Sequence, residues 1–364
     1  MRVSRLPLSL LFGFSLALVS VSLRADDTVR TLKAEISEPD AAHFAVENLL
    51  GTMRISVGSG AAVTVVATVY AESPELADAV RLERMAGQGG AATLRVRYPY
   101  DKVSTFRYRE PSDRGDSGFG GWASSSDYDY DGHRVRVSRG RGKRLYADVE
   151  IQVPAGRLNA GFRNLAGLVE AEGLRGQVRF GVGSADLRLR RLDGDFELDG
   201  SSGDVRARDI KGSWKSDFSS GDTDLDGFEG ESLSFQASSG DIVLRSIRAK
   251  RADFDTSSGD VRLLDADLEE FSAKATSGDV AFSAAGSALK QVRITTSSGD
   301  VSLHLPSNAA FEIDASQSSG EMEVGFSDGT AVRHRATLVG YRRGTGGARI
   351  HVRTSSGDLS VFPG

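Results

Sequence analysis

The stretch DTSSGDVRLL, residues Asp255–Leu264, contains a motif, Ser-Ser-Gly-Asp, that returns through the second half of the chain. Taking its glycine as the origin, copies lie at Gly203, Gly221, Gly240, Gly259, Gly278, Gly299 and Gly357, with threonine for the first serine at Gly278. Gly320 is followed by Glu321, and weaker copies lie at Gly167 and Ala185. Successive origins are 18–21 residues apart, except for a last spacing of 37. A fixed period indicates supersecondary units that stack on one another.

Apolar residues occupy the same places after each origin. The second and fourth residues, Val261 and Leu263 in the opening stretch, are apolar in nearly every copy. Alternation with period two predicts strands with one buried face, and identical phase predicts that these strands stack. We therefore expect an all-β, single-stranded β-solenoid, or β-helix, of about ten coils with two short strands each. An antiparallel sandwich is the alternative.

The rest of the chain is less regular. Residues 26–108 are expected to form an irregular N-terminal β region, with Ser73 capping a short helix. Residues 109–132 are rich in glycine, serine and aspartate and are expected to form a flexible insertion. The β-solenoid repeat domain is expected to span residues 133–364.

Residues 1–25 have the pattern of an export signal. Arg2 and Arg5 precede an apolar run, and Ala25 is a small residue before two aspartates. Cleavage at such a residue predicts an exported protein, periplasmic or at the cell surface, with no integral membrane domain left. An uncleaved membrane anchor is the alternative.

Composition narrows the function classes. The net charge of −5 over 364 residues lacks the basic excess typical of a nucleic-acid binder. The chain has no cysteine, which excludes disulfides, zinc–thiolate sites and cysteine nucleophiles.

The repeated aspartate has two interpretations. As a corner residue, it bonds nearby backbone N–H groups. As a cation ladder, stacked aspartates would share calcium, although one aspartate per coil is sparse for that ion. Arginines lie beside it on the same outward face, and they predict a solvated lattice of ion pairs or a binding surface for polyanions such as polysaccharides. These arginines are Arg188, Arg190, Arg206, Arg208, Arg245 and Arg262.

Two loops interrupt the repeat. Asp127, Asp129 and Asp131 match the first half of a calcium loop, but Ser138 stands where an EF-hand needs glutamate. They remain a candidate calcium site, and no other cofactor is expected. Ser327–Ala348 is a basic loop in which Arg342 and Arg343 are candidate binding residues.

The repeated corners, the "NLxGxV" openings such as Asn164–Val169, and the final "RIHVRTSSGDLSVF" resemble the bacterial adhesin-like β-strand-repeat family, domain of unknown function 4097. The resemblance runs from Phe44 to the C-terminus. It implies an all-β solenoid-like fold and an extracytoplasmic setting, and it offers no catalytic residue.

No histidine pair has metal-binding spacing, and no nucleophile elbow is present. We therefore expect an exported, non-enzymatic scaffold that interacts with an envelope polysaccharide or protein. A carbohydrate-active enzyme or a polysaccharide-binding β-helix is the alternative.

Overall fold

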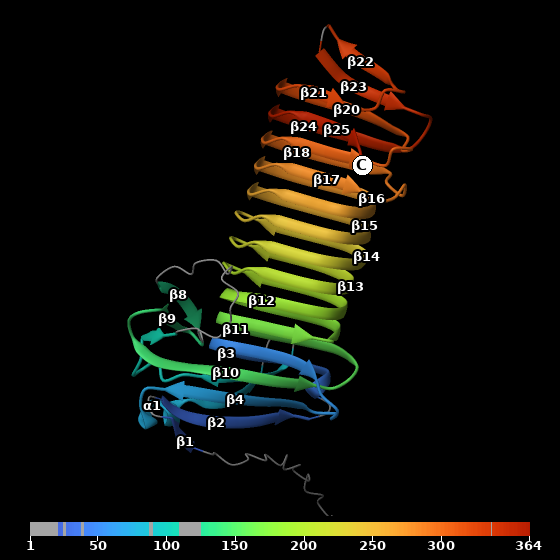
Figure 1. The fold of residues 1–364 in the computed structure, drawn as a ribbon. Helices are drawn as coiled ribbons and strands as arrows, with labels where there is room; N and C mark the ends of the chain where they lie inside the picture. The colour runs from blue at the N-terminus through green and yellow to red at the C-terminus, as the bar shows by residue number, and fades with distance from the viewer. Residues whose placement is uncertain (1–20, 25–26, 38–39, 87–89, 109–124, 336) are drawn as a thin grey trace, which may run out of the picture.

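Figure 1 shows a tall column of stacked coils on a broader N-terminal β region. This computed structural model describes residues 21–24, 27–37, 40–86, 90–108, 125–335 and 337–364. The predicted signal peptide lies outside the described residues, except for Val21–Arg24, which form β1. Within these ranges, no helix is long and apolar enough to cross a membrane.

The middle of the column is built from long strands that pair in parallel. Each pairs with the next at a shift of one repeat, for example Val205 with Thr223 and Ile242 with Val261. This pairing confirms the solenoid and excludes the sandwich here. The strands are β11 (Arg157–Glu172), β12 (Arg175–Gly200), β13 (Val205–Phe218), β14 (Thr223–Ala237), β15 (Ile242–Ser258) and β16 (Val261–Ser277).

Each of these coils has a second corner that the repeat motif does not mark. Six residues after the origin, Asp209, Ser246 and Asp265 have φ values of 57°, 54° and 57°. One left-handed residue bends the chain while the ladder continues on both sides. The prediction of two short strands per coil is therefore wrong for β13–β16. It holds farther on, where β18 and β19 are separate strands.

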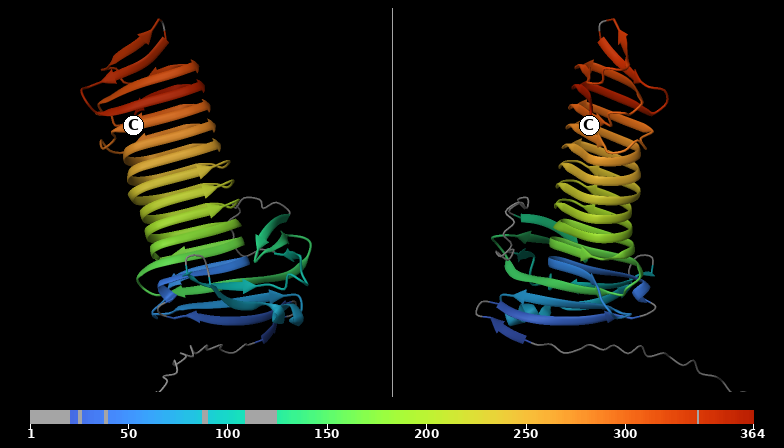
Figure 2. Two further views of the ribbon diagram at one scale, coloured as in Figure 1. Left: turned by 180° about the vertical axis from the view of Figure 1, so that it is seen from behind. Right: turned by 45° about the vertical axis from the view of Figure 1, so that its right-hand side comes forward.

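Stacking order departs from sequence order at the C-terminal end. β18 pairs with β24, and β24 pairs on its other side with β20. The final coil, β24–β25, therefore lies between two coils that precede it in sequence (Figure 2). The strands are β17 (Val280–Ala284), β18 (Gln291–Ser298), β19 (Val301–Leu305), β20 (Phe311–Ser319), β21 (Met322–Val324), β22 (Thr330–His334), β23 (Thr337–Arg343), β24 (Ala348–Ser356) and β25 (Leu359–Pro363).

The column also takes in a coil from the N-terminal region. β3 (His43–Val57) pairs in parallel with β11, and Gly51 lies opposite Gly167 at the corner. The two Asn-Leu motifs meet there, because Asn48 Nδ2 donates to Asn164 Oδ1 at 3.0 Å and Asn164 Nδ2 donates to the carbonyl oxygen of Gly51 at 2.9 Å. The expected boundary of the repeat domain at residue 133 therefore does not match the column.

Antiparallel strands close the N-terminal end. β4 pairs antiparallel with both β10 and β2, and β10 pairs in parallel with β3. Ser73 caps the short helix α1, as predicted. The elements are β2 (Asp27–Ile36), the 3-10 turn η1 (Asp40–Ala42), β4 (Val63–Ala71), α1 (Pro74–Ala79), β5 (Arg81–Ala86), β6 (Ala92–Arg97), β7 (Thr105–Arg107), β9 (His133–Ser138) and β10 (Lys143–Val153).

The expected flexible insertion is partly a strand. Residues 109–124 lie outside the described residues, but Ser125–Tyr130 form β8, which pairs antiparallel with β9. The resulting hairpin lies beside the lower coils of the column.

Candidate functional site

The Ser-Ser-Gly-Asp corner is fixed by its glycine. Gly259 has a φ of 109°, which favours a residue without a side chain. An added Cβ would also lie 2.2 Å from the carbonyl oxygen of Gly240 on the neighbouring coil. At Gly259 the neighbouring corner therefore lies too close for any residue with a side chain.

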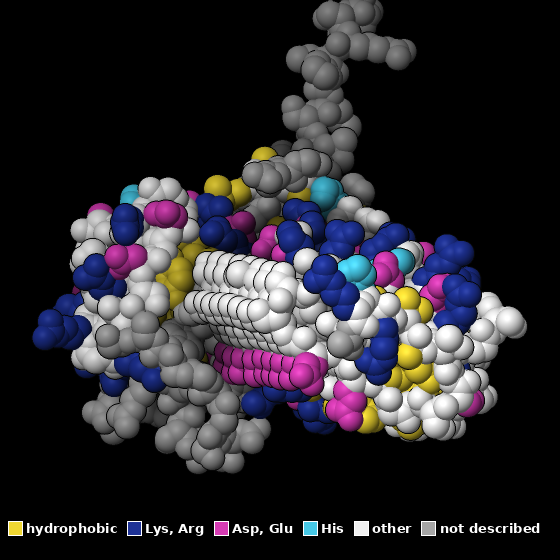
Figure 3. Space-filling view, turned by 90° about the horizontal axis from the view of Figure 1, so that it is seen from above, with side chains coloured by type: hydrophobic (Ala, Val, Ile, Leu, Met, Phe, Trp, Pro, Cys, Tyr) yellow, Lys and Arg dark blue, Asp and Glu magenta, His cyan; other side chains and the backbone are white. Residues whose placement is uncertain are grey.

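The corner aspartates form a ladder of hydrogen bonds. Oδ1 of Asp241 accepts the backbone N–H of Asp260 at 2.9 Å, and Oδ1 of Asp260 accepts that of Asp279 at 2.8 Å. The ladder follows stacking order, since Asp300 accepts from Asp358 and Asp358 accepts from Glu321. Figure 3 shows part of it as a file of acidic side chains. One oxygen of each such carboxylate is held by the main chain, which supports the corner interpretation.

The predicted arginine rows divide into two groups. Arg245 pairs with Asp224 at 2.7 Å, and Arg262 pairs with Asp260 and, at 3.6 Å, with Asp241. These contacts confirm the expected ion-pair lattice on β15 and β16.

The other four arginines form a block on β12 and β13. Arg188 lies opposite Arg206, and Arg190 lies opposite Arg208. Arg188 pairs with Glu170 at 3.6 Å. Arg190 and Arg208 are exposed, and neither has an ion pair with a carboxylate of the described residues.

The two arginines of the C-terminal loop hold the β22–β23 hairpin in place. Arg342 pairs with Glu312 on β20. Arg343 donates to both carboxylate oxygens of Asp328, at 2.5 and 2.8 Å, and lies 4.9 Å from the ring centre of Phe326. These arginines lower the pKa values of Glu312 and Asp328. Both arginines are therefore engaged within the molecule.

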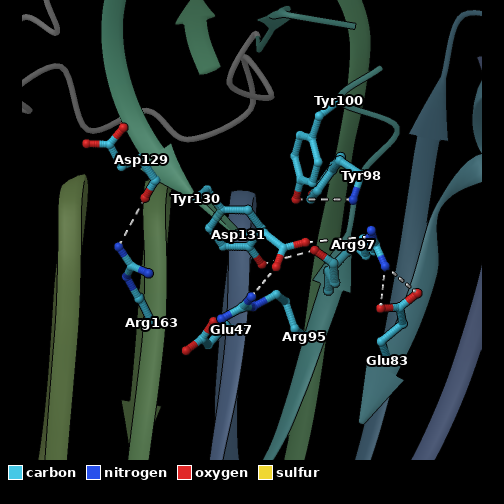
Figure 4. Close-up of polar contacts among 11 residues, drawn as sticks. Glu47, Glu83, Arg95, Arg97, Tyr98, Tyr100, Asp129, Tyr130, Asp131 and Arg163 are labelled. Carbon is cyan, nitrogen blue, oxygen red and sulfur yellow. Dashed lines mark hydrogen bonds and ion pairs between the residues drawn. The ribbon is translucent and has the colours of Figure 1, made fainter. Parts of the chain in front are cut away.

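The three aspartates of the candidate calcium loop do not converge. Asp127 is bound by Arg136 at 2.7 Å, and this contact lowers the pKa of Asp127. Asp131 contacts Arg95 on β6, while the backbone carbonyl of Asp129 accepts from Arg163 at 3.3 Å (Figure 4). The described part of the chain holds no group of three side chains placed to bind a metal ion.

The tyrosines of this motif anchor the hairpin instead. Tyr130 is fully buried, and its hydroxyl donates to the carbonyl oxygen of Val96 at 3.0 Å. Burial raises the pKa of Tyr130 well above its ordinary value. Arg95 lies 5.7 Å from the centre of that ring and donates to Glu47 at 2.7 Å (Figure 4). Tyr130 and Asp131 thus fasten the hairpin to β6, where Arg95 also binds Glu47 of β3.

Sequence reasoning missed a trough beside this hairpin, with a volume of about 1040 Å³. Its floor is the outward face of β3 and β11–β14, where Ala45, Gly161 and Gly181 leave space. Met85 and Ala86 of β5 line one side. The only signal in the sequence was glycine at outward strand positions, which can mark the close approach of another molecule.

Polar side chains cover the floor of the trough in two rows that cross the strands. Glu197 lies at the centre of one row, where it pairs with Arg179 and, at 3.4 Å, with Lys215. The second row consists of Asn159, Gln177, Asp195, Ser213 and Ser232.

Comparisons with known proteins place the chain in a family. No curated protein matches it. Three solved structures are similar, all with low TM-scores. A "putative lipid binding protein" from Parabacteroides distasonis is 13% identical, covers 92% of this chain and 96% of its own, and has a TM-score of 0.40. A "putative adhesin" from the same species is 12% identical, covers 91% and 96%, and has a TM-score of 0.31. A "putative cell adhesion protein" from Clostridium sporogenes is 9% identical, covers 92% and 100%, and has a TM-score of 0.18.

The family model named Toastrack DUF4097 matches residues 140–362, more than half of the chain. That range holds all the column coils except β3, and the match agrees with the resemblance of the corner motifs. The chain therefore belongs to the Toastrack DUF4097 family.

Proposed function

We propose that this chain is an exported, non-enzymatic scaffold that binds a glycan of the cell envelope in the trough. The trough carries the proposal, because it is large enough for several sugar units and its floor is covered by hydrogen-bonding side chains. The signal-like residues 1–25 support export to the periplasm or the cell surface.

The rigid floor suits such a ligand. The rows of Arg179, Glu197 and Lys215 and of Asn159 and Gln177 present donors and acceptors on paired strands. Sugar hydroxyls bond to such groups, while the C–H faces of the rings pack on apolar surface such as Met85 and Ala86. Little side-chain ordering is needed where ion pairs already fix the long side chains.

A substitution that fills the trough tests this proposal. Gly161 is not in the left-handed region, and an added Cβ would meet only the Ala45 side chain, at 3.5 Å. Gly161→Trp should therefore fold normally and fill the floor. We expect it to weaken binding to peptidoglycan sacculi or to the responding glycan of a glycan array by about tenfold or more.

The matched control is Val243→Trp, which adds the same ring on β15, away from the residues that line the trough. It should bind like the wild type. Equal binding by the wild type and Gly161→Trp, or binding by neither, would overturn the proposal.

A second candidate, glycan hydrolysis, rests on Glu197 of the trough floor and on Asp199, two residues farther along β12. Arg179 lowers the pKa of Glu197, while burial and then the nearby Glu197 raise the pKa of Asp199. Neighbouring carboxyls whose pKa values are pushed apart are typical of a base and an acid. The test is whether the wild type releases new reducing ends from a glycan. If it does, and both Glu197→Gln and Asp199→Asn abolish the release, the protein is an enzyme and the scaffold proposal is wrong.

A further inference from the structure

The out-of-order coil brings together basic side chains that are distant in sequence. Because β24 lies against β18, Arg293 faces His351 and Thr295 faces Arg353 in the register. Arg349 lies opposite Gln291 at the start of the same strands. Stacking in sequence order would instead place the acidic strand β20 beside β18.

These cations occupy one exposed surface. Arg349, His351 and Arg353 alternate with buried residues on β24, so they share the outward face with Arg293 on β18. Neighbouring strands are about 4.8 Å apart, which places these side chains within reach of a common ligand. We call Arg293, Arg349, His351 and Arg353 the C-terminal basic patch.

Most acidic neighbours of the patch are already engaged. Glu270 on β16 pairs with Arg251, and Glu312 on β20 pairs with Arg342. Asp314 lies 3.6 Å from His351. Among the described residues, no carboxylate lies within ion-pair distance of Arg293, Arg349 or Arg353. Glu312 lies opposite Arg349 on the next strand, and Arg349 adds to the lowering of its pKa. Positive charge therefore still exceeds negative charge on this part of the rigid sheet.

Hydroxyl groups surround the two central arginines. Ser272 on β16 lies opposite Arg293, while Thr295 and Ser316 lie on either side of Arg353. Guanidinium groups with neighbouring hydroxyls are a donor set for phosphate, sulfate or carboxylate oxygens. The positive charge and the donors thus favour the same kind of ligand.

We propose that the C-terminal basic patch binds the anionic groups of a linear sulfated or phosphorylated polymer. Several cations across adjacent strands match closely spaced anions better than one isolated ion. A membrane surface is less suited, because Val332 is the only large exposed apolar side chain at this end of the described structure. The site uses none of the trough residues, so it stands apart from the proposed function.

Binding of dextran sulfate, with uncharged dextran as the blank, tests the proposal on the full chain. Arg293→Gln/Arg353→Gln should weaken binding about tenfold or more at low salt. It should also reduce the slope of log affinity against log salt by about two, since two cations no longer displace counterions. Arg293→Lys/Arg353→Lys should keep most of the slope.

The matched control is Arg157→Gln/Arg248→Gln, which removes two exposed arginines from β11 and β15, away from the patch. It should bind dextran sulfate nearly as the wild type does. Equal weakening by the two glutamine variants would overturn the proposal, because binding would then depend only on net charge.

Two further probes distinguish the source of the anion. Inorganic phosphate should compete with dextran sulfate only weakly, as a single anion engages few of the cations. If the protein binds phosphatidylglycerol vesicles but not dextran sulfate, the proposal of a polymer ligand is wrong and the patch binds a lipid surface. Loss of glycan binding in Gly161→Trp with dextran sulfate binding retained would separate the trough from the patch.

Discussion

Gly259 shows how much of this fold depends on single residues. Its position combines a left-handed backbone with close contact to the carbonyl oxygen of Gly240. Gly259→Ala should therefore destabilise the protein by about 2–4 kcal/mol, from backbone strain and overlap together. Chemical denaturation at equilibrium measures this loss.

Gly346→Ala separates the two causes. Gly346 also has a positive φ, of 73°, but nothing lies within 4 Å of an added Cβ. Strain alone should cost about 1–2 kcal/mol there. If the two alanine variants lose equal stability, then contact between neighbouring corners contributes nothing.

For single residues, the sequence predicted the kind of interaction a side chain makes better than it predicted the partner. The repeated Asp260 predicted a hydrogen-bonding corner, but its partner, the backbone N–H of Asp279, belongs to the next coil and not to the same turn. The unpaired state of Arg190 and Arg208 was not predictable, because it depends on which neighbouring carboxylates other basic residues engage. Glu172, for example, is held by Arg191 at the second corner.

Among the elements, the β22–β23 hairpin depends most visibly on charge. Asp328 and Glu312 have lowered pKa values because Arg343 and Arg342 bind them. Protons bind such carboxylates more tightly in the unfolded chain. The stabilisation is therefore complete above the ordinary carboxyl pKa of about 4 and is lost as pH falls through the lowered values.

Hydrogen exchange should report this loss. Protection factors of the β23 amides should fall between about pH 7 and about pH 3, before those of the central coils fall. Asp328→Asn/Glu312→Gln should have weak protection in β23 at both values. A hairpin equally protected in acid would show that apolar contacts such as Tyr341 hold it instead.

The β8–β9 hairpin shows why a strand can be missed when structure is predicted from the sequence. Its alternating residues are aspartate and tyrosine, so the apolar period of a half-buried strand is hidden. Tyr130 is wholly buried and yet carries a hydroxyl, which Val96 satisfies. Only the tertiary partner reveals that the tyrosine side is the inner one.

Across the whole molecule, each coil supports mainly its two neighbours. Val261→Asp places a carboxylate in the core of a central coil and should cost about 3 kcal/mol or more. Hydrogen exchange should then speed up most in β14–β17, while β2, β4 and β10 stay protected. The outward Arg262→Ser should cost about 1 kcal/mol or less. Uniform loss of protection would contradict this stepwise coupling.

The column itself was predictable because the corner motif recurs at a regular spacing from Gly203 to Gly357. The order of its last coils was not. All coils share one register, so β18 offers the same edge to β20 as to β24. A periodic sequence shows that units stack, but it does not show which unit lies next to which.

The displaced coil also affects the timing of assembly. As the chain emerges, β11 to β19 can each join an edge that is already complete. β20 and β21 are made earlier than β24 and β25, yet their place in the column exists only after those later strands have joined β18 and β19. The last turn of the column therefore assembles as one late event, in which β24–β25 join the column and β20–β21 then pair with them.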